Sequence, residues 1–306
     1  MDAIQKNLLE QIAGLHEVPA GAYNIRANGA SVGRNTTAHI DIVTKEDKQG
    51  IDIIIKPGTK NESVHIPVVL SQSGIQESVY NDFYIGEDAD VTIVAGCGIH
   101  NSGDEKSQHD GIHTFHVGKN AVVTYSEVHY GEGEGEGKRI LNPQTILYLE
   151  EGAKVTLEST QIRGVDDTKR YTKAVLKGEN AEFIVQEKLL THGDQKADSV
   201  MDVFLDGENS SCRVISRSVA QDESTQTFYP RVVGNTACFG HVQCDSIIMG
   251  KAKVRSIPEI SCNHVDAGLI HEAAIGKIAG DQILKLQTLG LSYEEAEEKI
   301  LEGFLR

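Results

Sequence analysis

The side chains with the clearest chemical potential are thiols and imidazoles in the last third of the chain. Cys238, Cys244 and Cys262 are three of only five cysteines, and His264 and Asp266 follow the third in an alternating pattern. On a strand, this alternation would place Cys262, His264 and Asp266 on one face, and one unbroken strand would do the same for Cys238 and Cys244. An odd cysteine count without a CxxC pair argues against a disulfide framework. The thiols could be core side chains, reactive groups or metal ligands.

Two polar segments upstream are further candidates. Residues 98–116 contain four histidines, and residues 131–137 read GEGEGEG. A metal site is one interpretation of each. No carboxylate stands at a recognisable ligand spacing in the first segment, and glycine would release the second from any fixed ligand geometry. We therefore interpret the first as a solvated loop that re-enters a strand and the second as a solvated loop. His113 and His116 are three residues apart, so on a strand they would face opposite sides.

Repeated strands would have to position these groups. A sequence pattern recurs in which an apolar strand end, a polar turn and a small residue precede a β-rich run. The small residues are spaced by 32, 32, 28 and 29 positions: Ala89, Ala121, Ala153, Ala181 and Ser210. A period of this size predicts a solenoid. Alternating Val, Thr, Ile, Tyr and Phe between Gly, Asn and Asp indicates strands. We predict a mainly β protein with a right-handed parallel β-helix, with a jelly roll or propeller as alternatives. Cys97 and Cys212 fall within these strands and are expected to be buried.

Helical patterns flank the repeats. Residues 1–19 contain an amphipathic helix that would cap the first coil, and the β-helix core is expected over 20–265. Residues 269–289 have apolar spacing close to that of a helix, and Ser292 opens a capping box with Glu295. The region 266–306 is therefore predicted to be a helical hairpin, which could be a cap or a docking platform for another protein.

Composition and missing motifs exclude several classes of function. A formal net charge of −16 argues against nucleic acid or an anionic membrane as a partner. No apolar run approaches the roughly 18–20 residues needed to span a bilayer, and the N-terminus lacks a signal pattern. We expect a soluble, cytoplasmic protein. Phosphate-loop, dinucleotide, zincin and nucleophile-elbow motifs are missing, so the chain alone does not resemble an enzyme.

The C-terminal motifs resemble a known family. QCDSIIMG at 243–250, the segment from SIPEI to IHEAAIGKIAGDQIL, and the closing LGLSYEEAEEKILEGF are similar to the SufB/SufD iron–sulfur cluster assembly scaffolds. The resemblance implies a β-helix between helical ends, with subunits paired through the C-terminal ends of their β-helices. It also implies a nascent cluster at that junction, and an ABC-type ATPase, similar to SufC, that docks on the C-terminal helices and hydrolyses the ATP.

The resemblance also implies specific roles. Cys244 would be the thiolate ligand and sulfur acceptor, Glu272 an oxygen ligand or proton handler, and His271 a junction histidine. Because one chain carries all three, a homodimer is expected. The cluster, expected to be a transient [4Fe–4S], would use sulfur from a donor such as a cysteine desulfurase and pass to apo iron–sulfur proteins. Cys238, Cys262 and His264 are candidates to complete the ligand set.

The spacing of 28 residues between Cys244 and Glu272 corresponds to about one coil, so the two could stack in neighbouring layers. The opposing interpretation makes Cys244 a buried strand thiol and His271–Glu272 a pair at a helix start. The chain is shorter than typical SufB or SufD and lacks their large N-terminal helical domain and a CxxC-type motif. Two other functions stay open: a β-helix carbohydrate-active enzyme and a metal-free structural adaptor.

Overall fold

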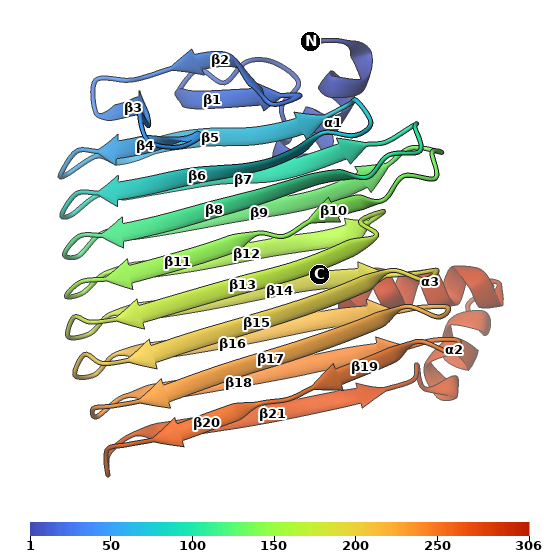
Figure 1. Ribbon diagram of the computed structural model, residues 1–306. Coiled ribbons are helices and arrows are strands. Elements are labelled where there is room, and N and C mark those ends of the chain that lie inside the picture. Colours follow the sequence, from blue (N-terminus) through green and yellow to red (C-terminus); the bar gives the residue numbers. More distant parts are fainter. Residues whose placement is uncertain (306) are drawn as a thin grey trace.

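A computed structural model describes residues 1–305 as a flattened β-solenoid (Figure 1). Its coils contribute alternately to two sheets, whose strands pair in parallel except for the antiparallel pairs β1–β2 and β3–β4 at the N-terminal end. Sheet A contains β1 (Ala22–Ala27), β2 (Ala30–Asn35), β5 (Lys60–Leu70), β7 (Asp90–His100), β9 (Val122–Glu132), β12 (Lys154–Arg163), β14 (Glu182–Thr191), β16 (Ser211–Ala220), β18 (Phe239–Ile248) and β21 (Gly268–Gly276). Sheet B contains β3 (Ile40–Thr44), β4 (Gly50–Ile55), β6 (Gln76–Ile85), β8 (Ser107–Val117), β10 (Arg139–Leu141), β11 (Gln144–Leu149), β13 (Asp167–Leu176), β15 (Lys196–Leu205), β17 (Thr225–Gly234), β19 (Lys253–Ser256) and β20 (Glu259–Cys262). The predicted parallel β-solenoid is confirmed.

The repeated turns explain why the coils stack in register. The residue before each small residue has a positive φ, which Asn, Asp and Gly tolerate better than other residues: Asp88, Asn120, Gly152, Asn180 and Asn209. The small residue that follows is fully buried in every copy. Two positions later, inward side chains align from coil to coil: Val91, Val123, Val155, Phe183 and Cys212. The turn thus fixes which face of each strand enters the core.

The histidine-rich segment enters a strand, as expected, but the solvated loop is much shorter than expected and most of the segment is β8. Residues 107–117 form β8, and His109 and His113 point into the solenoid interior, where both are buried. His109 Nδ1 lies 3.1 Å from Glu77 Oε1, and His113 Nδ1 lies 2.7 Å from the Tyr125 hydroxyl. The loop is reduced to residues 101–106.

The Gly-Glu segment is also more ordered than expected. It packs against residues 101–105, and a Cβ on Gly133, Gly135 or Gly137 would lie 2.1–2.3 Å from backbone oxygens there. Gly135 and Gly137 donate backbone hydrogen bonds to the carbonyls of Asn101 and Gly103. Glycine is therefore required here for close backbone packing, and only the intervening glutamates face solvent.

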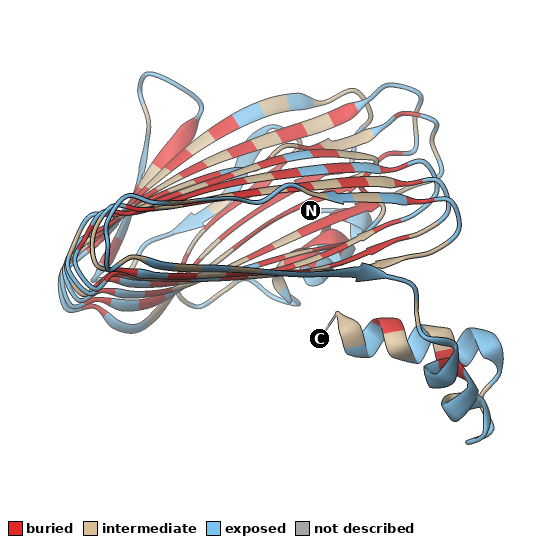
Figure 2. Ribbon diagram, turned by 90° about the horizontal axis from the view of Figure 1, so that it is seen from below, coloured by how far each residue is buried: buried red, intermediate tan, exposed pale blue. Residues whose placement is uncertain are grey.

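Helices lie outside sheet A at both ends. The predicted N-terminal helix is present as α1 (Ala3–Ala13), but it buries Leu8, Leu9 and Ile12 beside β5, β7 and β9 of sheet A instead of capping the first coil. At the other end, α2 (Gly280–Gln287) and α3 (Tyr293–Phe304) form a hairpin beside the solenoid (Figure 2). The predicted capping box of Ser292 and Glu295 is present. Within the described residues, no helix is both long and apolar enough to cross a bilayer.

The helix expected over 269–289 was partly wrong. Residues 268–276 form β21, which pairs with β18, and the first helix of the hairpin begins only at Gly280. Parallel pairing with a complete neighbouring strand outweighed the local helical spacing of the apolar residues, because secondary structure of a short segment depends on its tertiary partners. The strand region therefore extends past the boundary expected at residue 265.

Buried polar groups make the core sensitive to acid. Burial lowers the pKa of His113 to about 4, so between pH of about 6.5 and 4 the unfolded chain binds the extra proton. Burial raises the pKa of Glu127, but His129, His113 and Arg170 outweigh it and hold the pKa at about 2. Both groups therefore cost stability as pH falls, His113 first and Glu127 below about 4.5.

We expect the free energy of unfolding to decrease by up to about 1.4 kcal/mol per pH unit for each group within its window. Urea unfolding at several pH values between about 7 and 4 measures this. The variant His113→Gln should flatten the upper part of the profile, whereas His16→Gln, at an exposed histidine, should leave it unchanged. A pH-independent midpoint for the unsubstituted chain would contradict the assignment.

Candidate functional site

The C-terminal end of the solenoid has an unpaired rim. Strand β21 is the last strand of sheet A, and β19 and β20 are the last strands of sheet B. Figure 2 looks onto this end, and no helix among residues 1–305 covers it. An exposed strand edge offers free backbone N–H and C=O groups to another chain. Two of the predicted site residues meet here. His271 lies on the rim strand β21, and Cys244 lies on β18, one coil further inside.

Cys244 lies on β18 with its side chain in the interior, only 3% exposed. Ser216 of β16 and Ala273 of β21 are its register partners in the coils on either side. His271 Nε2 of β21 lies 3.4 Å from Cys244 Sγ. Burial, with a contribution from the negative charge of Glu187, raises the pKa of the thiol to about 11. Cys244 is therefore a protonated thiol at neutral pH, and a metal ion would have to displace its proton.

Glu272 does not join this pair within one chain. Alternation along β21 points it to the outer face of sheet A, opposite to His271. Its side chain is 63% exposed, and its Oε2 lies 3.5 Å from His241 Nε2. The expected stacking holds for the strands, since Glu272 pairs with Gln243 next to Cys244. It fails for the side chains, and the helix-start interpretation of His271–Glu272 is also wrong because both residues are in a strand.

The other three candidates lie elsewhere. Cys238 and Cys244 share the inner face, as predicted, but they are about 20 Å apart at roughly 3.3 Å per residue. Cys262 ends β20 beside Gly234, and His264 follows in an exposed turn. Among residues 1–305, no group of three or more His, Cys, Asp or Glu side chains is placed to hold a metal ion. Among the predicted site residues, Cys244 and His271 are the pair that the structure brings into contact within one chain.

A buried polar column leading to Cys244 was missed. Glu127, Ser159, Glu187, Ser216 and Cys244 are register partners in successive coils. Each of the first four stands six residues after the small residue of its repeat, so aligning the repeats at that position would have revealed the column. Glu187 accepts hydrogen bonds from Arg170, at 2.6 Å, and from Ser199 and Ser216. The cavity between Glu187 and Cys244 is only about 10 Å³, near the lower limit for one water molecule.

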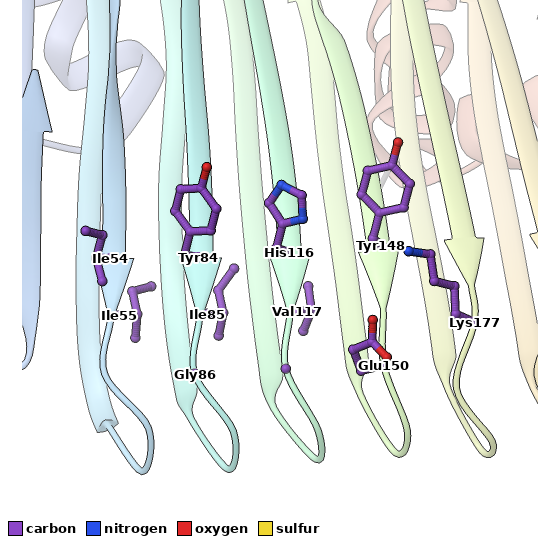
Figure 3. Close-up of a pocket in the computed structure, with 11 residues that line it drawn as sticks. Ile54, Ile55, Tyr84, Ile85, Gly86, His116, Val117, Tyr148, Glu150 and Lys177 are labelled. Atoms are coloured by element: carbon purple, nitrogen blue, oxygen red, sulfur yellow. The ribbon is translucent and has the colours of Figure 1, made fainter. Parts of the chain in front are cut away.

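A larger hollow lies on the outer face of sheet B, in coils that precede the coil of Cys244, and Figure 3 shows the residues that line it. It has a volume of about 330 Å³ and is lined by Tyr84, His116 and Tyr148 from successive coils. Their rings stack on each other, with centroids 5.1 and 5.6 Å apart. The His116 ring is stacked between those of Tyr84 and Tyr148, so its two faces are not free to stack on a sugar. His116 is thus separated from the buried His113, as the alternation predicted.

Fold and site together define a class: a parallel β-solenoid with a thiol–imidazole pair at an unpaired C-terminal end. A family model described as "SUF system FeS cluster assembly, SufBD core domain" matches residues 73–304. This match covers most of the chain, which therefore belongs to the SufBD family. The resemblance in the C-terminal motifs is confirmed and extends over most of the repeats.

Curated relatives carry the same family name. The chain is 28% identical over 265 residues to an iron-sulfur cluster assembly SufBD family protein of Methanothermobacter thermautotrophicus strain Delta H, covering 84% of this chain and 62% of the relative. It is 27% identical over 255 residues to one of Methanocaldococcus jannaschii, covering 83% and 79%. A chloroplastic SufBD family protein of Arabidopsis thaliana is 28% identical over 211 residues, covering 66% and 38%. The chain thus spans less than two thirds of several relatives.

Proposed function

We propose that the chain is a scaffold subunit of a SUF-type assembly complex, on which a nascent iron–sulfur cluster is built at the junction of two copies. The Cys244–His271 contact of 3.4 Å at the unpaired end of the solenoid is the observation that carries this proposal. Thiolate is the ligand that such clusters prefer, and imidazole is a known alternative. Here the cluster is cargo, expected as [4Fe–4S] and released to apo-proteins, so a ligand set with few cysteines suits the role.

A second copy would supply what one chain lacks. Two copies meeting edge to edge at β21 would be related by a two-fold axis, so each would contribute one thiol and one imidazole to the same junction. Backbone groups left unpaired at the β21 edge favour such pairing. Glu272, on the outer face of this strand, would then lie at the border of the junction rather than at its centre. The incompleteness of the site in one chain supports the proposed homodimer.

The hairpin of α2 and α3 suits the docking of an ATPase. Leu284 and Leu289 are largely exposed on it. A hollow of about 590 Å³ separates α3 from Ile162 and Leu190 of sheet A and is lined on the α3 side by glutamates. A partner with apolar and basic groups would fit this surface. We propose an ABC-type ATPase similar to SufC at this position, with sulfur supplied by a donor such as a cysteine desulfurase.

Anaerobic reconstitution with ferrous iron and sulfide tests the scaffold function, alone and with the ATPase. We expect iron, sulfide and visible absorption to appear together on a dimer. Partner binding without any cluster would favour the adaptor alternative instead. Turnover of a polysaccharide by the purified chain would favour the carbohydrate-active alternative.

The junction can be tested separately with a charge at the rim. Ile275 is 41% exposed on β21, so Ile275→Lys is expected to leave the fold intact but to place a charge in the proposed interface. Sedimentation should then show monomer where the unsubstituted chain is a dimer, and cluster loading should fall with it. Val32→Lys, at a residue 49% exposed on β2 at the opposite end, is the matched control. Dimers that survive Ile275→Lys but not Val32→Lys would put the interface at the other end.

A further inference from the structure

A second group of thiols lies at the turn end of the same coils, away from Cys244. Cys212 is near the start of β16, Cys238 immediately precedes β18, and Cys262 is the last residue of β20. All of them are free, and only Cys262 is exposed. Cys238 is about 20 Å from Cys244 along β18. These thiols therefore form a separate feature that the proposed cluster site does not use.

Gly234 brings Cys238 and Cys262 together. Cys262 pairs in parallel register with Gly234 of β17, so its side chain points to the same interior face as a side chain at 234 would. A Cβ built on Gly234 would lie 2.8 Å from Cys238 Sγ. Because Gly234 has no side chain, the Cys238 thiol lies directly against this residue, whose neighbour on the next strand is Cys262. Neighbouring strands are about 4.8 Å apart, so Cys262 lies one strand spacing from the glycine that the Cys238 thiol adjoins.

The two thiols differ in access. Cys262 is open to solvent because no coil follows β20 within the described residues, whereas Cys238 is 8% exposed. Burial raises the pKa of Cys238, and the nearby Cys262 adds to the effect. An oxidant would thus meet Cys262 first, and Cys238 would be placed to resolve the product. Cys212 is one coil deeper, beside Gly240, and is buried.

We propose that Cys238 and Cys262 form a redox-active dithiol that closes to a disulfide across the last two coils. The oxidant is a low-molecular-weight disulfide. The Cys262 thiolate attacks one sulfur of it, forming a mixed disulfide and releasing one thiolate. Cys238 then loses its proton to solvent, and its sulfur attacks Cys262 Sγ and expels the second thiolate. Two electrons pass from the protein dithiol to the small disulfide, which leaves as two thiols.

The closed form would link the rim strand β20 to the coil that precedes it. Such a link restricts the opening of the rim, because a cross-link removes conformations in which the two coils separate. The dithiol does not depend on the proposed scaffold function, since it requires neither iron nor a second copy.

Oxidised glutathione and peptide mapping test the dithiol. Trypsin leaves Cys238 and Cys244 in one peptide, from Val232 to Lys251, and Cys262 in another that ends at Lys277. The experiment is therefore done on Cys244→Ser, so that the first peptide has one thiol. After oxidation and alkylation of free thiols, we expect these two peptides to be joined within one chain. The additional substitution Cys262→Ser should remove the link, whereas Cys97→Ser, at a buried thiol several coils away, should not.

A dithiol-selective probe provides a second measurement. Phenylarsine oxide should bind one equivalent to the unsubstituted chain, and Cys262→Ser should lose this binding. Cys262 is exposed, so that variant is expected to fold even if a substitution at Cys238 does not. A link between Cys262 residues of two chains would overturn the proposal. So would a stable glutathione adduct on Cys262 that never resolves, or Cys262 unmodified by glutathione and arsenical alike.

Discussion

Replacing Cys244 with serine is expected to abolish assembly of a stable cluster on the chain. We expect iron and sulfide content after anaerobic reconstitution to fall by more than about tenfold, since loss of even an outer-shell partner of a metal ligand costs about 10–100-fold. The physical reason is that a serine hydroxyl stays protonated and is a poor replacement for thiolate, while His271 alone cannot hold a cluster. Metal analysis and visible absorption measure the effect.

The matched control is Cys212→Ser, which makes the same chemical change at a buried thiol of the same sheet. This variant should load like the unsubstituted chain, and circular dichroism should show that both variants are folded. If Cys244→Ser and the unsubstituted chain load equally, Cys244 is not the ligand. In that case Cys238 and Cys262 would become the first thiols to test.

The second large effect is expected from the ion pair inside the solenoid. Arg170 and Glu187 are 2.6 Å apart, with both side chains about 5% exposed or less. Arg170→Met keeps much of the side-chain length but leaves the Glu187 carboxylate buried without its counter-charge. Removing one partner of a buried pair costs about 3–5 kcal/mol. We expect a decrease of this size in the free energy of unfolding, measured by urea denaturation followed by circular dichroism.

Lys154→Met provides the comparison on the surface. Lys154 and Glu182 form an exposed ion pair with a separation of 3.5 Å, and such pairs contribute little to stability. The midpoint of unfolding should therefore stay close to that of the unsubstituted chain. If Arg170→Met behaved like Lys154→Met, the Glu187 carboxylate would have to be protonated or hydrated inside the coils. The double variant Arg170→Met with Glu187→Gln should recover part of the loss, because it removes the unpaired charge.

The stacking of the coils could be predicted from local sequence patterns. Each turn is encoded locally, by a residue that tolerates positive φ followed by a small one that must be buried, as at Asn120 and Ala121. Strand alternation then assigns the inward side chains without any knowledge of the neighbours. The C-terminal motifs, which resemble those of the family confirmed for residues 73–304, pointed to Cys244, and the capping box at Ser292 fixed the start of the last helix.

Which face a side chain takes, and which residues it contacts, could not be predicted at the ends of the repeats, because long-range strand pairing sets both. Residues 268–276 have helical and strand-like spacing at once, and pairing with β18 made them a strand. That choice brought His271 to Cys244 and turned Glu272 away. His109 and His113 look like loop residues in a polar segment, but Glu77 and Tyr125 from neighbouring strands satisfy them inside the core. In each case the deciding contact comes from a neighbouring strand of the stack. The spacing of residues within a short segment does not encode such long-range pairing.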